Sequence, residues 1–288
     1  MEFGPGEHRL TVLGAGVMGS NITTLAIGYG LPVHLVDVDR PTLDQARARI
    51  ARQLRHAHLL GALPADQPAG ELVTSTSVAG AEGATAVLEA VTELPDVKRK
   101  VLAEVAAVVP PGTPLVSNTS GIPIDELAEE LPCPEQLVGT HFMNPTYLIK
   151  MVELVRGPRT SDAAVAAVES LLGALDRTPV VVRDDPGFVT SRLLHPMINQ
   201  AARIVERGTA TVDAVDTLMQ GCLGHPTGPL RTADLIGLDN LVDSLAALYE
   251  RTGEQSCRPC DLLLEKVASG DLGRKTGQGF YDYGEVLS

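Results

Sequence analysis

The stretch Leu10–Asp39 reads LTVLGAGVMGSNITTLAIGYGLPVHLVDVD. An apolar run, Leu10–Leu13, is typical of a buried strand, and a glycine turn leads from it into a helical pattern. A second apolar run, Val33–Val36, ends at Asp37. This order of strand, glycine turn, helix and strand is the context in which a G-x-G-x-x-G motif binds a dinucleotide.

Each glycine of the turn has its own physical purpose. Gly14 allows the tight turn, Gly16 lets a pyrophosphate approach the backbone, and Gly19 lets the helix pack closely on the strand. The phosphates would then bind the backbone N–H groups of Val17 and Met18 at the start of the helix. A chance glycine-rich turn is the competing interpretation, and the complete context makes it the weaker one.

An acidic residue follows the second strand. Asp37 lies 18 residues after Gly19, where a carboxylate accepts hydrogen bonds from ribose hydroxyls. A 2′-phosphate at this position would meet a like charge, so the sequence favours NAD over NADP. Arg40 is close enough in sequence to leave that preference open.

Length and composition indicate an ordinary globular protein. The 288 residues have room for two domains, and 44% are hydrophobic and 20% charged. A net charge of −13, with 3% aromatic residues and no Trp, argues against a nucleic-acid partner. No apolar run reaches the roughly 18 residues of a membrane span. The first eight residues read as a loose leader without the pattern of a signal peptide, so we expect a cytoplasmic protein.

The four cysteines are too few for a disulfide framework in a chain of this length. Cys257-Arg-Pro-Cys260 has the spacing of a redox motif or of half a zinc site. No second pair and no suitably spaced histidine completes a ligand set. We therefore expect two plain thiols and no metal.

Apolar strand-like runs alternate with helical patterns as far as Val182, which predicts a doubly wound sheet with ligands at the carboxyl ends of its strands. The further predicted strands are Leu72-Val73, Ala86–Val91, Pro114–Val116, Leu137–Met143, Ile149–Val155 and Pro179–Val182, the last with a buried character. The further predicted helices are Pro41–Leu60, Val97–Val108, Ile122–Leu131 and Ala163–Leu175.

Asp184-Asp185-Pro186-Gly187 is the clearest break in the chain, and strand patterns nearly vanish after it. We expect a Rossmann-type domain over residues 1–186 and an all-helical domain over 187–288. The apolar helices of the second domain predict a symmetric dimer. The helices expected there are Val189–Arg207, Thr211–Leu223, Thr232–Thr252 and Cys260–Ser269.

The predicted helix Pro41–Leu60 is rich in cations in a chain that is otherwise acidic. One interpretation is a helix face exposed to solvent, which is what a run of charged residues usually forms. The other is a surface for an anionic group, such as a coenzyme A phosphate or an acidic carrier protein. The two stay open. The cations of this region are Arg40, Arg47, Arg49, Arg52, Arg55, His56 and His58.

One histidine occupies a position suited to catalysis. His141 ends a predicted strand, and Glu153 lies on the next strand after a turn at Asn144-Pro145. A carboxylate that holds one imidazole nitrogen fixes the tautomer and stabilises the imidazolium, which gives a general base. Ser120, at the end of the preceding strand, could bind a substrate oxygen. Each residue alone is more often structural: a satisfied histidine, or a serine that caps a helix.

Seven motifs, in order from Leu10 to Tyr283, resemble the 3-hydroxyacyl-CoA dehydrogenase family, and especially its bacterial 3-hydroxybutyryl-CoA dehydrogenases. They are GAGVMG, LEAVTEL, SNTS, GTHFMNP with MVELV, DDPGFVTSRLL, GHPTGPL with DLIGLD, and GRKTGQGFYDY.

The resemblance implies reversible NAD-dependent oxidation of an L-3-hydroxyacyl thioester to the 3-oxoacyl thioester. By this resemblance His141 removes the hydroxyl proton, Glu153 is the carboxylate partner of His141, and Ser120 binds the reacting oxygen. The family positions near the cofactor are matched by Glu93, Lys98, Asn144 and Lys275. Glu93 and Lys98 could equally form an exposed ion pair, and Lys275 could be a cation at a helix end.

The chain departs from the family pattern in two places. Ser191 replaces the usual Asn of PGF-x-x-N-R, and the helix Pro41–Leu60 lacks the lysine of a frequent coenzyme A contact. Both departures fit a different substrate, a small polar 3-hydroxyacyl group on an acyl carrier protein of polyketide extender-unit biosynthesis. The sequence also leaves room for a non-catalytic NAD-binding protein and for a sugar-acid dehydrogenase of related fold.

Overall fold

The computed structural model describes residues 8–284. The chain forms two compact units, with the division between Asp185 and Pro186. Most of the expected leader lies outside the described residues. Its last residue, His8, is buried and lies 3.5 Å from the hydroxyl of Ser170, so the expectation of a loose leader is wrong for His8.

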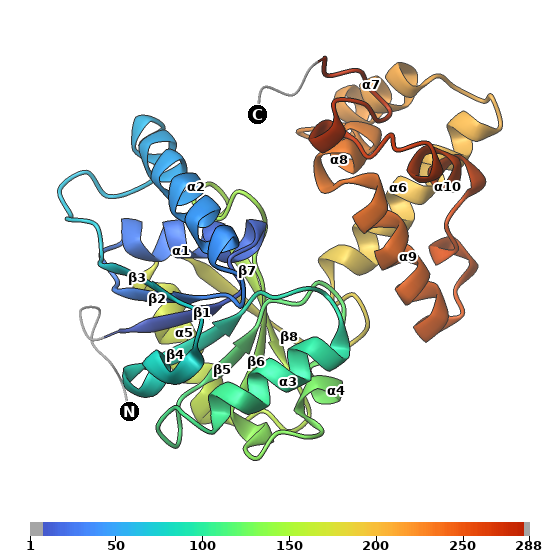
Figure 1. Cartoon of the computed structure of the whole chain (residues 1–288). Helices are drawn as coiled ribbons and strands as arrows, with labels where there is room; N and C mark the ends of the chain where they lie inside the picture. The colour runs from blue at the N-terminus through green and yellow to red at the C-terminus, as the bar shows by residue number, and fades with distance from the viewer. Residues whose placement is uncertain (1–7, 285–288) are drawn as a thin grey trace. The chain divides into compact units, whose positions relative to one another are not determined.

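The first unit is built on one eight-stranded sheet in the order β3-β2-β1-β4-β5-β6-β7-β8 (Figure 1). Neighbouring strands are parallel except β6 and β7, which pair antiparallel. The predicted doubly wound sheet is confirmed. The strands are β1 Leu10–Leu13, β2 Val33–Val36, β3 Leu72–Ser75, β4 Ala86–Glu89, β5 Leu115–Ser117, β6 Leu137–His141, β7 Met151–Arg156 and β8 Thr178–Arg183.

Helices cover both faces of this sheet, with α1 and α5 on one face and α3 and α4 on the other (Figure 1). The apolar stripes of α1, α2 and α5 pack into a single core with the strands, and α2 lies against α1. The elements are α1 Val17–Gly28, α2 Arg40–Leu59, α3 Pro95–Ala106, α4 Ile124–Ala128, α5 Asp162–Ala174, and the 3₁₀ turns η1 Val78–Gly83 and η2 Pro134–Gln136.

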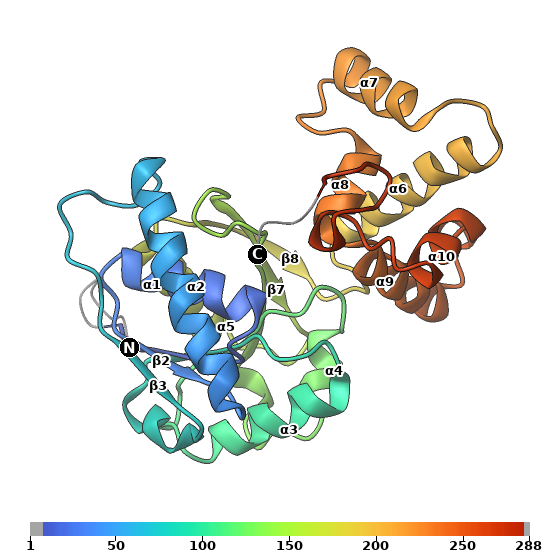
Figure 2. The ribbon, with the colours of Figure 1, turned by 45° about the horizontal axis from the view of Figure 1, so that its top comes forward.

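The second unit is helical, and α6 contacts α7, α8, α9 and α10 (Figure 2). Two buried carboxylates organise it. Asp216 accepts hydrogen bonds from the N–H groups of Leu230 and Arg231, and Asp234 accepts from those of Phe280 and Tyr281. The elements are α6 Thr190–Glu206, α7 Val212–Leu223, α8 Pro229–Ile236, α9 Leu238–Thr252, α10 Asp261–Ala268, and the 3₁₀ turns η3 Gln255–Cys257 and η4 Arg274–Thr276.

The prediction of one helix over Thr232–Thr252 is wrong, because this segment forms parts of two helices, α8 and α9. Gly237 adopts a φ of +94° between α8 and α9, a backbone conformation that favours glycine and interrupts the helical hydrogen-bond pattern.

The helix expected over Ile122–Leu131 is shorter than predicted. It begins at Ile124, where the carboxylate of Asp184 accepts hydrogen bonds from the N–H groups of Ile124 and Asp125. Burial raises the pKa of Asp184 above its ordinary value despite these donors. The carboxylate that marks the end of the first unit in sequence therefore also caps α4.

The buried character expected for Pro179–Val182 is wrong. Val180 and Val181 are about half exposed, because β8 is the last strand of the sheet and pairs only with β7. Over residues 8–284, we find no helix with both the length and the apolar character needed to cross a bilayer.

Candidate active site

The glycine turn has no space for a side chain at Gly14 or Gly19, but it has open space at Gly16. A Cβ atom at Gly14, whose φ is +97°, would lie 2.5 Å from the carbonyl oxygen of Ala90. One at Gly19 would lie 1.8 Å from the carbonyl oxygen of Gly14. At Gly16 it would meet none of the described atoms within 4 Å. The turn therefore packs β1, β4 and α1 together and faces open space at Gly16.

The N-terminus of α1 opens onto that space without a capping side chain. Gly16 is the N-cap residue and makes no side-chain hydrogen bond to the first turn, where Val17 and Met18 begin the helix. Backbone N–H groups at such an end are suited to phosphate oxygens. The residues present therefore fit the pyrophosphate of a dinucleotide.

Asp37 is fixed beside the same turn. Its Oδ2 accepts a hydrogen bond of 2.7 Å from the N–H of Ala15, and its Oδ1 accepts one of 3.1 Å from the N–H of Asp39. These two donors hold the carboxylate next to the glycine turn, where a ribose would follow the pyrophosphate.

Arg49 of α2 also reaches the turn, a contact that the sequence pattern did not predict. One guanidinium nitrogen, Nη1, donates to the carbonyl oxygen of Gly16 and to the hydroxyl of Ser20, both at 3.1 Å. Arg49 is therefore not a simply solvated cation. The i, i+4 pattern of α2 gave no sign of this contact, because the partners are 33 and 29 residues away.

A buried polar cluster lies at the carboxyl ends of β4 and β5. The side chains of Glu89 and Lys98 are 0% exposed, with Lys98 Nζ 2.7 Å from Glu89 Oε1. Glu89 also accepts hydrogen bonds from the hydroxyl of Ser117 at 2.6 Å and from the N–H of Val91 at 2.7 Å. A buried carboxylate with three donors meets the requirement that buried charge be paired and hydrogen-bonded.

Glu93 extends this cluster to the loop after β5. It lies 3.0 Å from Lys98 Nζ, and its Oε1 accepts from the hydroxyl of Thr119 and, at 2.8 Å, from the N–H of Ser120. Glu93 and Lys98 do pair, but the hypothesis of an exposed pair is wrong for Lys98. Because the cluster holds the backbone of Ser120, it orients the exposed serine at the sheet edge.

His141 and Glu153 face one another across β6 and β7. They are register partners of the antiparallel pair, and Nδ1 of His141 lies 2.7 Å from Oε2 of Glu153. Their side chains are 8% and 9% exposed. Nδ1–H donating to the carboxylate leaves Nε2 as the nitrogen that can accept a proton.

The loop after β5 is tied to the loop after β6. The side-chain oxygen of Asn118 accepts a hydrogen bond of 3.1 Å from the N–H of Phe142, next to His141. Ser120 and His141 therefore belong to two linked segments at the carboxyl edge of the sheet. Asn144, three residues after His141, is exposed in the same loop.

The remaining predicted site residues belong to the second unit and are described within it. Ser191 is buried in the first turn of α6. Lys275 Nζ lies 2.6 Å from Oδ1 of Asp239. Burial alone would raise the pKa of the Asp239 carboxyl. The hydrogen bond from Lys275 and its positive charge outweigh burial, so the pKa of Asp239 lies below its ordinary value.

Cys257 ends η3 and Cys260 precedes α10, and both are buried free thiols. Burial raises the pKa of the Cys260 thiol, which makes it a poor nucleophile. No group of three or more His, Cys, Asp or Glu side chains within residues 8–284 is arranged to hold a metal ion.

The carboxyl edge of the first unit thus combines a dinucleotide-binding turn, an acid placed for ribose and a carboxylate-held histidine. Together with the doubly wound sheet, these define the class of nicotinamide-dependent dehydrogenases.

The chain belongs to the 3-hydroxyacyl-CoA dehydrogenase family. Residues 9–185 match the family model described as 3-hydroxyacyl-CoA dehydrogenase, NAD binding domain. Residues 187–283 match the model of the 3-hydroxyacyl-CoA dehydrogenase C-terminal domain. The resemblance inferred from the seven motifs is confirmed, as is the expected class of enzyme, an NAD-dependent oxidoreductase that acts on a CH–OH group.

Two curated relatives are similar over almost their whole length. A probable 3-hydroxybutyryl-CoA dehydrogenase of Bacillus subtilis is 38% identical over 283 residues, which are 97% of this chain and 99% of the relative. A 3-hydroxybutyryl-CoA dehydrogenase of Bradyrhizobium diazoefficiens is 37% identical over 279 residues, 96% of this chain and 95% of the relative.

Two solved structures are similar to this chain over nearly its whole length. FadB2 of Mycobacterium tuberculosis has a TM-score of 0.92 at 37% identity, over 97% of this chain and all of FadB2. The (S)-3-hydroxybutyryl-CoA dehydrogenase PaaH1 of Ralstonia eutropha has a TM-score of 0.87 at 35% identity, over 97% and 100% of the two chains.

The buried ion pair of Glu89 and Lys98 predicts how substitutions at these two residues change the free energy of unfolding. Lys98→Met should lower the free energy of unfolding by about 3–5 kcal/mol, because it leaves the carboxylate of Glu89 buried without its cation. The double variant Glu89→Gln/Lys98→Met should recover most of that loss, because it removes both charges. Chemical denaturation followed by circular dichroism measures both.

Lys100→Met, on an exposed position of the same helix, is the matched control and should change little. A Lys98→Met variant as stable as this control would contradict the role given to the pair.

Proposed function

We propose that the enzyme oxidises a short-chain L-3-hydroxyacyl-CoA, such as 3-hydroxybutyryl-CoA, to the 3-oxoacyl-CoA with NAD, and catalyses the reverse reaction. The observation that carries the proposal is the contact of 2.7 Å between His141 and Glu153 at the carboxyl end of β6. The names of the relatives support the choice of a thioester of coenzyme A.

In this proposal His141 is the general base of the oxidation. Nε2 takes the proton from the C3 hydroxyl while the C3 hydride leaves, so that a C=O bond forms. The carboxylate of Glu153 holds Nδ1 and stabilises the imidazolium that results. In the reverse direction the imidazolium returns the proton to the carbonyl oxygen.

NAD, when bound, supplies the hydride acceptor. Gly14, Gly16 and Gly19 would admit its pyrophosphate to the N–H groups of α1, and Asp37 would accept the ribose hydroxyls. The Glu93–Lys98 pair would support the loop that faces the cofactor.

The remaining predicted residues have supporting roles in the proposal. Ser120, held by Glu93, would donate a hydrogen bond to the reacting oxygen. Asn144 would lie near the nicotinamide, and Ser191 and Lys275 would come from the helical unit, which we regard as the substrate and dimerisation domain. The hydroxyl of Ser191 is shorter than the amide that is usual in the family.

His141→Ala should lower the turnover of 3-hydroxybutyryl-CoA about 10²- to 10⁴-fold, because general acid–base catalysis contributes that much. Glu153→Gln should also lower turnover, because an amide next to Nδ1 no longer fixes the productive tautomer. The rate of NADH formation, followed by absorbance, measures both effects.

Lys100→Ala, at an exposed position of α3, is the control and should leave turnover unchanged. NAD binding should survive in all three variants. NADH formation by His141→Ala at the unaltered rate would remove the histidine from the mechanism. Absence of turnover in the unmodified enzyme, with NAD still bound, would favour a non-catalytic NAD-binding protein.

An acyl carrier protein as the carrier of the substrate is the second candidate. The exposed side chains of Arg52 and Arg55 on α2 favour it, because an acidic carrier would be attracted to them. We expect kcat/KM to be higher for 3-hydroxybutyryl-CoA than for the same acyl group on a carrier protein. A higher value for the carrier thioester, lost in Arg52→Glu/Arg55→Glu, would reverse this assignment.

We also propose a homodimer formed through the helical unit. Several large apolar side chains of α6, α7 and α8 are more than half exposed, which is unusual unless a partner covers them. They are Leu193, Leu218, Leu223 and Leu235.

Light scattering should therefore give about twice the chain mass of 30.3 kDa. Leu193→Glu should shift the protein toward the monomer, because it places a charge on the apolar surface. Leu60→Glu changes an equally apolar residue of the first unit, which is 52% exposed, and should leave the dimer intact. A monomer in the unmodified protein would refute this part of the proposal.

A further inference from the structure

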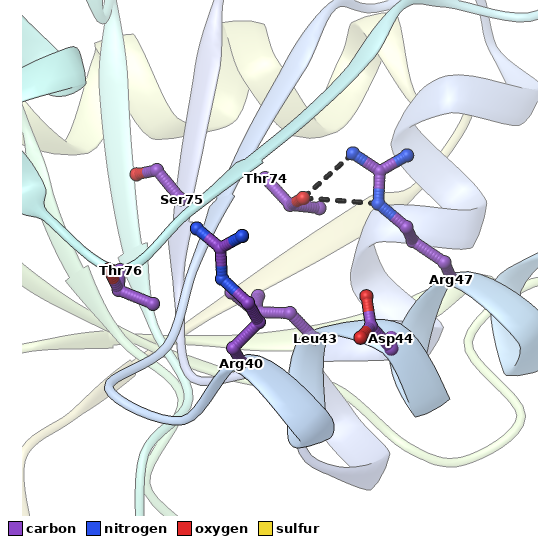
Figure 3. A pocket seen from close by; sticks show the side chains of 7 residues that line it. All are labelled: Arg40, Leu43, Asp44, Arg47, Thr74, Ser75 and Thr76. Atoms are coloured by element: carbon purple, nitrogen blue, oxygen red, sulfur yellow. Dashed lines mark hydrogen bonds between the residues drawn. The ribbon is translucent and has the colours of Figure 1, made fainter.

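The arginines of the first unit differ in what their guanidinium groups bind. Arg47 of α2 is exposed, and its Nε and Nη2 both donate to the hydroxyl of Thr74, at 3.1 and 2.7 Å (Figure 3). Arg177 is only 3% exposed and lies in the connection between α5 and β8. Arginine is rarely buried to this degree unless its charge and its N–H donors are satisfied. The partners of Arg177 therefore indicate its role.

Three backbone carbonyl oxygens accept hydrogen bonds from Arg177. Nη1 donates to those of Thr146 and Ile149, at 2.9 and 3.1 Å, and Nε donates to that of Leu175 at 3.0 Å. Nη2 donates to the hydroxyl of Tyr29 at 3.3 Å, and the guanidinium carbon lies 5.7 Å from the centre of the Tyr29 ring. The guanidinium thus joins the segment between β6 and β7 to the ends of α5 and α1.

These partners are neutral. Arg177 forms no salt bridge with any residue in the range 8–284. The adjacent carboxylate, Asp176, has a side chain that is 56% exposed and pairs with Lys150 at 2.6 Å instead. A buried charge without a carboxylate carries a desolvation cost, but a planar guanidinium can hold two carbonyl oxygens at fixed positions. The contact is therefore suited to fixing where the bound segment lies.

The segment that Arg177 holds contains a tight turn. The N–H groups of Leu148 and Ile149 donate to the carbonyl oxygen of Pro145, at 3.1 and 3.2 Å. A cation is favourable at the carbonyl end of such a turn, because the peptide dipoles point toward it. The hydroxyl of Thr146 adds a second anchor by donating to the carbonyl oxygen of Asn21 at 2.8 Å. The turn is thus fixed from two sides.

Asn144 lies directly before this turn. It is exposed, and it is the residue of the segment that the proposed function places near the nicotinamide. On its other side, the N–H of Phe142 donates to the side chain of Asn118 at 3.1 Å. The backbone on both sides of Asn144 is therefore held, by Asn118 before it and by Arg177 after it.

We propose that Arg177 is a positioning residue for the dehydrogenase reaction, which fixes the turn 145–149 and thereby places Asn144 at the nicotinamide half of the cofactor. The inference rests on the proposed function for the role of Asn144. The separation of His141 and Glu153 is set by the β6–β7 ladder and does not depend on Arg177. Loss of Arg177 should therefore disturb the nicotinamide and leave the proton-transfer pair in place.

Arg177→Met removes the charge and the donors but keeps most of the length of the side chain. It should lower kcat/KM with NAD and 3-hydroxybutyryl-CoA about 10- to 100-fold, the loss expected when a reacting group is displaced by about 1 Å. It should also weaken binding of NADH but not of 5′-AMP, which carries only the half of the cofactor that Asp37 would bind. Isothermal titration calorimetry on the full chain measures both affinities.

Two further variants accompany it. Arg177→Lys keeps the charge and should recover part of the NADH affinity. Arg156→Met is the matched control, because Arg156 is an exposed arginine of β7 that pairs with Asp162 on the surface. It should change neither the affinities nor kcat/KM.

A double-mutant cycle with Asn144→Ala separates positioning from a merely structural role. If Arg177 acts through Asn144, then Arg177→Met should weaken NADH binding little further once Asn144 is alanine. A structural role would instead give additive losses and would weaken NADH and 5′-AMP alike. Circular dichroism reports whether Arg177→Met folds, and Arg177→Lys takes its place in the cycle if it does not.

Unchanged kcat/KM and NADH affinity in Arg177→Met would overturn the proposal. So would equal losses of NADH and 5′-AMP affinity, or additive effects of Arg177→Met and Asn144→Ala. Failure of the proposed function has a different signature, in which the unmodified enzyme oxidises no thioester while the affinities for NADH and 5′-AMP can still be compared among the variants.

Discussion

The carbonyl oxygen of Gly14 occupies the space where a side chain at residue 19 would begin, and most of the first unit depends on that close approach. A Cβ atom at Gly19 would lie only 1.8 Å from this oxygen. Because Gly19 has no Cβ atom, α1 can start directly over the end of β1. Asp37 and Arg49 then meet the backbone of the turn from β2 and α2. Three consecutive elements, α1, β2 and α2, are thereby fixed around one loop.

Charge is arranged differently at the two halves of the carboxyl edge. Around β4 and β5 the buried carboxylate of Glu89 is paired with Lys98, which also lies 3.0 Å from the half-exposed Glu93. Around β6 and β7 a single carboxylate, Glu153, faces an imidazole that can change its own charge. The first arrangement favours rigidity, and the second favours proton transfer. The hydrogen bond from Phe142 to Asn118 links the two.

Local patterns in the sequence predicted the sheet, the glycine turn and the proximity of β6 to β7, because each depends on residues close together in the chain. Contacts between distant segments escaped prediction. Burial of Lys98 also escaped prediction, because the sequence pattern does not show that its Nζ turns back to the carboxylate of Glu89, nine residues earlier at the end of β4. Arg47 and Arg49 look alike in the helical pattern, yet one meets Thr74 and the other meets Gly16. Nor does the pattern of Thr232–Thr252 reveal the positive φ of Gly237.

The antiparallel pairing of β6 and β7 has a consequence for how the protein can vary. His141 and Glu153 are direct cross-strand partners, so the ladder of backbone hydrogen bonds sets their separation, and the nine residues that join the two strands do not. The connecting segment 142–150 is held by contacts of its own, because Phe142 donates to the side chain of Asn118, Thr146 donates to the carbonyl oxygen of Asn21, and Tyr147 is buried in the core. A substitution in that segment would therefore act first on its own anchors, while the two strands keep the separation of His141 and Glu153.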